Sequence, residues 1–224
     1  EMNAKPILRS LLAVLLSATL LWAGDPWVEK PYTEWTEEDI EKVLEDSPWA
    51  HKVRMQVQKR LESSELLMTV NRVFTVQWAS SLTVRQALTR QWQLQGKANE
   101  KEGERFLSAP PPDYIVILRG YDLTDLAPAS LQRALFEQEA MTNIYIQPRQ
   151  SEQRIGPVRV QFVRESDRVV AAILYFPRQV DGKAILGADE VKVTFRCLHP
   201  LTGVASITTT FDLSKMVRDG QPDF

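Results

Sequence analysis

The chain has 224 residues, of which 44% are hydrophobic and 25% are charged, and its formal net charge at pH 7 is −2. These proportions are typical of a folded globular protein with a sizeable core, and they exclude the disordered class, which is poorer in apolar residues. A net charge close to zero disfavours a protein that binds nucleic acid through a basic excess, so we expect no nucleic-acid partner.

Residues 1–23 have the pattern of a Sec-type signal peptide. Lys5 and Arg9 precede an apolar run at positions 11–23, after which the sequence turns polar. Such peptides have a basic start and an apolar stretch of roughly 7–15 residues, whereas a bilayer span needs roughly 20. We predict cleavage after Ala23, a secreted or periplasmic protein, and no membrane span after cleavage. A retained membrane anchor is the alternative.

The acidic segment at positions 34–50 carries one tryptophan near each end. Thr36 and Asp39 have the spacing of a capping box, and Pro48 disfavours helical geometry in the residue before it. The acids after Thr36 then lie in the first helical turn, where the helix dipole favours negative charge. We predict a helix in which these acids serve helix stability and not chemistry.

A β-hairpin and a second helix are expected next. Apolar and polar residues alternate over 53–61 and 72–79, as they do in half-buried strands. The second helix is predicted over 83–95, beginning with a capping box of Thr83 and Gln86 and ending at a glycine.

Residues 96–112 are rich in charge and end in three consecutive prolines. This composition predicts a long exposed loop, which is also a possible subdomain boundary. We otherwise expect residues 24–224 to form a single domain.

Strands outnumber helices in the second half. One further helix is predicted at 127–140, and strands or hairpins are predicted at 113–120, 143–148, 158–176 and 191–213. Because short turns join most strands, the sequence predicts an α+β fold of mainly antiparallel sheet built from hairpins, with about three short helices.

The chain contains no phosphate-binding, dinucleotide-binding, nucleophile-elbow or zinc-protease motif, so we expect no cofactor. Cys197 and His199 are two residues apart on one strand face, but Val191, Val193 and Phe195 share that face. This pattern predicts a core position for the thiol, and we expect neither a Cys–His catalytic pair nor a metal site. A pair of carboxylates for glycosidic hydrolysis stays open.

Five tryptophans follow residue 23, and most have an expected packing role. Trp78 and Trp92 lie on predicted core faces, whereas Trp27 and Trp49 have no evident partner. Exposed indoles bind sugars or protein partners, so Trp27 and Trp49 are the candidate ligand-binding residues, with a packing role as the alternative.

Four motifs together resemble an uncharacterised family of exported proteins of acidobacterial type. They are K-P-Y-T-E-W at 30–35, D-S-P-W at 46–49, F-P-R-Q-V-D-G-K at 176–183 and F-D-L-S-K-M at 211–216. The resemblance implies one continuous exported unit, and it brings no assigned activity, ligand or catalytic residue.

The sequence therefore leads us to expect an exported, non-catalytic protein that binds an unknown protein partner or envelope ligand. The alternatives are a small secreted hydrolase with paired carboxylates and a subunit of a cell-envelope assembly. An uncovered sheet edge or a large apolar patch would favour the assembly subunit.

Overall fold

The computed structural model describes residues 24–60, 67–120, 141–151, 153–166, 168–187, 189–198 and 206–224. Its strands pair antiparallel and its helices are short, which confirms the predicted α+β fold with mainly antiparallel sheet. The helices are α1 (Pro26–Glu29), the 3₁₀ helix η1 (Tyr32–Glu34), α2 (Glu37–Glu45), α3 (Leu82–Leu94) and α4 (Glu100–Leu107). The longer strands are β1 (Ala50–Arg60), β2 (Leu67–Trp78), β3 (Tyr114–Gly120), β4 (Ile144–Pro148), β5 (Arg159–Glu165), β6 (Arg168–Phe176), β9 (Lys192–Leu198) and β10 (Ser206–Asp212).

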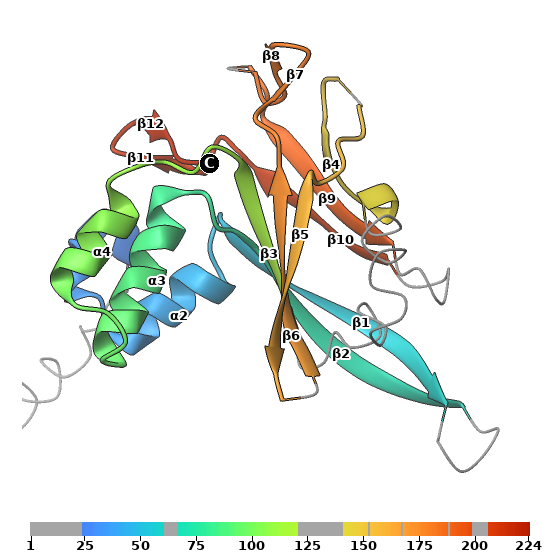
Figure 1. The fold of residues 1–224 in the computed structure, drawn as a ribbon, viewed down its shortest axis with the longest axis horizontal. Coiled ribbons are helices and arrows are strands. Elements are labelled where there is room, and N and C mark those ends of the chain that lie inside the picture. The colour runs from blue at the N-terminus through green and yellow to red at the C-terminus, as the bar shows by residue number, and fades with distance from the viewer. Residues whose placement is uncertain are drawn as a thin grey trace, which may run out of the picture.

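The larger sheet has five strands in the order β1-β2-β3-β6-β5 (Figure 1). The hairpins β1–β2 and β5–β6 are confirmed predictions, and β6 lies between β3 and β5 in the sheet. Along β2, Phe74, Val76 and Trp78 are buried on one face, while Val73, Thr75 and Gln77 lie on the other. The two faces of this sheet therefore meet different surroundings.

The smaller sheet has the order β10-β9-β4, and it packs against the face that carries Trp78. The Trp78 ring lies 5.3 Å from that of Phe211 on β10, and the His51 ring of β1 stacks on Phe211 at 4.7 Å. His51 Nδ1 is also 2.8 Å from the Thr209 hydroxyl oxygen. The main core therefore lies between the two sheets.

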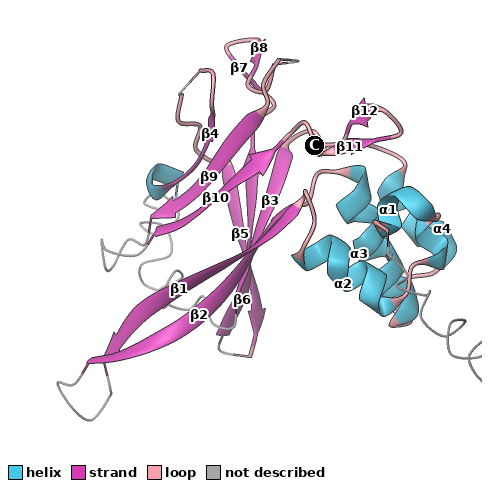
Figure 2. Cartoon of the chain, turned by 180° about the vertical axis from the view of Figure 1, so that it is seen from behind, coloured by secondary structure: helices cyan, strands magenta, loops and turns pink. Residues whose placement is uncertain are grey.

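Helices α1, α2, α3 and α4 form one group beside the five-stranded sheet (Figure 2). Helix α2 begins with the predicted capping box, in which Thr36 accepts from the Asp39 backbone and the Asp39 carboxylate accepts from the Thr36 backbone. Its buried residues are Ile40, Val43 and Leu44, which form the expected apolar stripe.

Two short hairpins, β7–β8 (Gln179–Val180 and Lys183–Ala184) and β11–β12 (Val217–Arg218 and Gln221–Pro222), complete the described elements. In β7–β8, Asp181 and Gly182 have φ values of 51° and 74°. Positive φ at both central residues is the requirement of a type I′ turn, for which Asp-Gly pairs are strongly preferred.

The predicted start of α3 was wrong. Ser81 is the N-cap, since its side chain accepts from the Val84 backbone, and Thr83 and Gln86 lie inside the helix. The loop predicted over 96–112 was also wrong in part, because α4 occupies Glu100–Leu107 and starts with a capping box of Asn99 and Glu102. The proposed subdomain boundary stays a prediction.

Arg85 of α3 holds the end of α4 in place, because its Nη1 donates to the carbonyls of Phe106 at 3.1 Å and Ala109 at 2.9 Å.

The core position predicted for Val191 was wrong, since this residue precedes β9 and is 45% exposed. The predicted signal peptide at 1–23, the helix predicted at 127–140 and His199 lie outside the described residues.

Candidate functional site

The two tryptophans predicted to bind a ligand lie against each other, with ring centroids 5.4 Å apart in an edge-to-face arrangement. Trp49 is fully buried, and its Nε1 donates to the backbone carbonyl of Asp223 at 2.6 Å. Trp27 is half-buried and has the Lys42 ammonium 5.7 Å from its ring centroid. Ligand binding at these tryptophans stays a prediction, and only Trp27 has an exposed surface for it.

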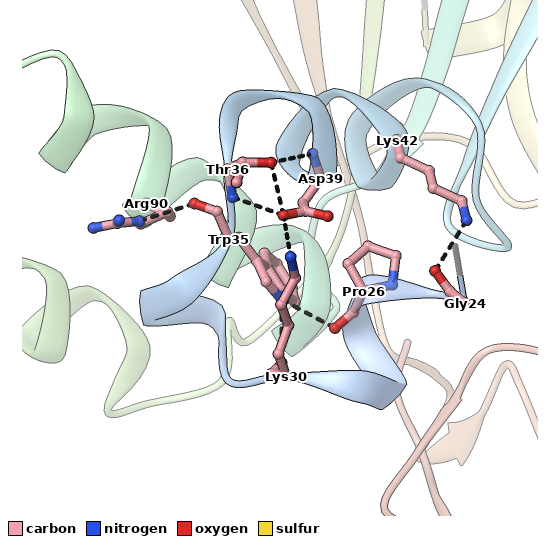
Figure 3. Close-up of polar contacts among 8 residues, drawn as sticks. All are labelled: Gly24, Pro26, Lys30, Trp35, Thr36, Asp39, Lys42 and Arg90. Carbon is pink, nitrogen blue, oxygen red and sulfur yellow. Dashed lines mark hydrogen bonds and ion pairs between the residues drawn. The ribbon is translucent and has the colours of Figure 1, made fainter. Parts of the chain in front are cut away.

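Hydrogen bonds and an ion pair join residues in and next to α1, η1 and the start of α2 (Figure 3). Trp35 Nε1 donates to the carbonyls of Pro26 at 3.1 Å and Lys30 at 3.2 Å, and Lys30 Nζ lies 2.7 Å from the Asp39 carboxylate. Burial opposes ionisation of Asp39, but its hydrogen bonds to Lys30 and Thr36 outweigh burial and lower its pKa. These side chains hold the start of α2.

The C-terminal residues form a second network, which we call the C-terminal anchor: Asp223, Phe224 and the side chains of Trp49, Thr83 and Arg178 that bond to them. The Asp223 carboxylate accepts from the backbone of Leu82 at 2.5 Å, and from the backbone and hydroxyl of Thr83 at 3.0 and 2.6 Å. These groups lie at the N-terminus of α3, where unpaired N–H donors and the helix dipole favour a carboxylate.

Arg178 links the anchor to the chain before β3. Its guanidinium lies 4.2 Å from the Tyr114 ring centroid, and it donates to the carbonyls of Pro111 at 3.2 Å and Phe224 at 3.3 Å. Trp49 and Arg178, which belong to two of the sequence motifs quoted above, thus bond in the anchor.

A groove of about 770 Å³ lies elsewhere, between the helices and the face of the five-stranded sheet that is turned away from the smaller sheet. Helix α2 and the C-terminal part of α3 form its walls, and β2, β3, β5 and β6 form its floor. Its lining residues are Glu37, Ile40, Glu41, Leu44, Glu45, Val73, Thr75, Gln77, Gln91, Leu94, Gln95, Ile117, Arg119, Gly120, Val163, Glu165, Val170, Ala171 and Ile173. This volume is in the range of about 300–1,000 Å³ that is usual for small-molecule sites.

Two polar side chains of the groove floor are incompletely bonded. Gln77 is 1% exposed, and its Nε2 donates to the Leu44 carbonyl at 2.5 Å, but its Oε1 has no hydrogen-bond partner among the described residues. Arg119 is half-buried, and its Nε likewise lacks a partner within the described ranges. Thr75 pairs with Arg119, and Gln77 pairs with Ile117, so the two polar side chains lie on one face of adjacent strands.

The charges around Arg119 do not neutralise it. Burial lowers its pKa, and the charge of Glu45 opposes this shift. Glu45 is, however, 2.5 Å from Lys52 Nζ, and its hydrogen bond raises the pKa of Lys52. No carboxylate of the described part of the chain lies within ion-pair distance of Arg119.

Among the described residues that line the groove, Thr75 carries the only hydroxyl, and there is no His, Cys or Lys side chain beside it. Cys197 is remote from the groove and 2% exposed, and burial raises the pKa of this thiol to about 12, so it is neutral at physiological pH. Within the described residues, no three His, Cys, Asp or Glu side chains are grouped to hold a metal ion. None of the described helices is long and apolar enough to cross a membrane.

Sequence reasoning did not identify Gln77 and Arg119 as site residues. One readable signal existed, since Arg119 is a cation at the end of the apolar strand Y-I-V-I-L-R-G.

Comparison with protein-family models, curated proteins and solved structures finds no match.

Proposed function

We propose that this protein is an exported, non-catalytic binding protein that holds a small ligand in the groove between α2, α3 and the five-stranded sheet. The observation that carries the proposal is the groove floor, where Gln77 Oε1 and Arg119 Nε have no partner among the described residues. A buried polar group without a partner is destabilising by about 1–3 kcal/mol, so a ligand that pairs with it gains affinity. The signal-peptide pattern of residues 1–23 supports export.

A variant with a filled groove tests this proposal. Thr75 lies on the groove floor, so Thr75→Phe places a ring in the cavity, whereas Thr69→Phe makes the same change at an exposed position of β2 outside it. Thermal unfolding is measured with a panel of acylated amino acids, fatty acids, oligosaccharides and short peptides. We expect at least one ligand to raise the melting temperature of the parent and of Thr69→Phe, but not of Thr75→Phe. Equal shifts in all three proteins, or no shift at all, would contradict the proposal.

A carboxylate-pair hydrolase is the second candidate, because acids from two different elements line the same groove. Glu41 lies on α2 and Glu165 on β5. Glycoside hydrolysis needs two carboxyl groups about 5–9.5 Å apart. Hydrolysis of nitrophenyl glycosides that is lost in Glu41→Gln and Glu165→Gln, but retained in Glu104→Gln on α4, would favour this candidate over the binding protein.

A further inference from the structure

We propose that the groove selects an apolar monoanion: a molecule with one carboxylate, an N–H donor next to it and an aliphatic body. This inference rests on the proposed binding function and names its ligand class. An acylated amino acid and the C-terminus of an apolar peptide share this chemistry.

The carboxylate follows from Arg119. Its guanidinium lines the groove and is partly removed from water, and no described carboxylate forms an ion pair with it. Glu45, whose charge favours the protonated guanidinium, already forms an ion pair with Lys52. A planar carboxylate matches the guanidinium fork, in which the unpartnered Nε is one of the donors.

The N–H donor of the proposed ligand is inferred from Gln77. The Leu44 carbonyl can only accept, so the Gln77 amide nitrogen must face it, and the amide oxygen is left as an acceptor. Gln77 is among the residues that line the groove, and its amide oxygen is buried without a partner in the described part of the chain. A ligand N–H one or two bonds from the carboxylate reaches Gln77 while the carboxylate meets Arg119 on the adjacent strand.

The aliphatic body follows from the other lining residues. Val73, Leu94 and Val163 line the groove from three different elements, and they are 46%, 44% and 38% exposed. Ile117 and Ile173 continue the apolar surface across the floor. Removal of this surface from water favours a ligand that carries a branched or linear hydrocarbon group.

The restriction to one negative charge follows from the acids of the groove. Glu37 and Glu41 of α2 and Glu165 of β5 line it and are exposed. A second negative charge on the ligand would lie near these carboxylates and be repelled. The groove therefore discriminates against nucleotides and other polyanions.

Matched ligands test each part of this proposal by isothermal titration of the full chain. N-octanoyl-L-leucine carries the acid, the N–H and the hydrocarbon; its methyl ester lacks the charge, and decanoate lacks the N–H. We expect the acid to bind most tightly, decanoate more weakly, and the ester at least about 10-fold more weakly than the acid, which is the usual effect of losing a charged hydrogen bond. A peptide ending in Leu-Leu with a free carboxylate separates the two sources, since its binding favours a peptide ligand.

Variants locate the site. Arg119→Met should lower the affinity for N-octanoyl-L-leucine about 10- to 100-fold, and Arg119→Lys should restore part of it. Arg54→Met is the matched control, because Arg54 lies on the same sheet face of β1 but outside the groove lining, and its affinity should equal that of the parent. Equal binding of acid and ester, or full affinity in Arg119→Met, would overturn the inference.

Failure of the ligand class and failure of the proposed function give different results. If no anionic ligand binds, but another panel member stabilises the parent and not Thr75→Phe, then the groove binds ligands and only the class is wrong. If no panel member distinguishes the parent from Thr75→Phe, both proposals fail.

Discussion

The C-terminal anchor and the groove are two polar regions of one protein. They differ in whether their polar groups have hydrogen-bond partners within the protein. In the anchor, the Asp223 carboxylate meets two backbone N–H groups and a hydroxyl, and the Trp49 indole meets a carbonyl. In the groove, Gln77 Oε1 and Arg119 Nε meet no partner from the described residues.

This difference separates polar groups that hold the fold from polar groups that are available to a ligand. In a closed network every donor and acceptor has a partner, so the network stabilises the native state and leaves no group free for a ligand. In an open network some groups lack a partner, which lowers stability until a ligand bonds to them. Asp39, Trp35 and Trp49, which lie in the acidic segment that attracts attention in the sequence, belong to the closed kind. Variants in the two regions should therefore change stability in opposite directions.

The largest effect is expected at Asp223. Asp223→Ala leaves two backbone N–H groups at the start of α3 without their acceptor, so the free energy of unfolding should fall by about 3 kcal/mol in urea titrations. Asp223→Asn keeps an acceptor and should lose less. Asp113→Ala, at a carboxylate with no hydrogen bond to the described residues, should stay within about 0.5 kcal/mol of the parent. A loss equal to that of Asp113→Ala would show that the anchor is not stabilising.

A smaller, pH-dependent effect is expected at His51, where the two sheets meet. Burial lowers the pKa of His51, and the charge of Asp46 opposes this only partly. The folded state thus favours the neutral ring. The stability of the folded state is therefore complete above about pH 6.5, the pKa of His51 in the unfolded chain, and part of it is lost as the pH falls from there through the lower pKa of His51 in the folded protein. Unfolding free energies at pH 7.5 and 5.0 should differ less in His51→Gln than in the parent. An unchanged difference would exclude His51 as the cause.

The smallest effect, with the opposite sign, is expected at Arg119. Arg119→Met removes a half-buried cation that has no ion pair in the described structure, so unfolding free energy should be unchanged or rise by up to about 1 kcal/mol. Arg54→Met on the same face should have no effect. A clear loss of stability in Arg119→Met would place Arg119 among the closed networks and remove the distinction between the two regions.

Much of the fold could be predicted because its determinants are local. The capping box of Thr36 and Asp39 and the alternation along the hairpin strands are contained within a few residues. The capping box of Asn99 and Glu102 was an equally local signal, but the charged composition of α4 favoured a loop. The N-terminus of α3 was misplaced because Ser81, two residues before Thr83, is an equally suitable N-cap, and its hydroxyl accepts from the Val84 backbone.

The groove could not be predicted because it depends on how helices lie over a sheet. The alternation of β2 places Gln77 on the face opposite Trp78, a face that a sequence assigns to solvent. Only the packing of α2 above this face buries Gln77 and brings the Leu44 carbonyl to it. Arg119 becomes notable for the same reason, since its surroundings come from other segments of the chain.

The bonds of Asp223 also set the order in which the protein can mature. Leu82 and Trp49 donate hydrogen bonds to Asp223, which lies 141 and 174 residues further along the chain. A chain still emerging from the ribosome cannot form these bonds, and such long-range contacts slow folding in general. The N-terminal half should therefore stay loosely structured until synthesis has passed Asp223, and this would suit the export proposed above, because a chain threaded through a translocation channel is unfolded.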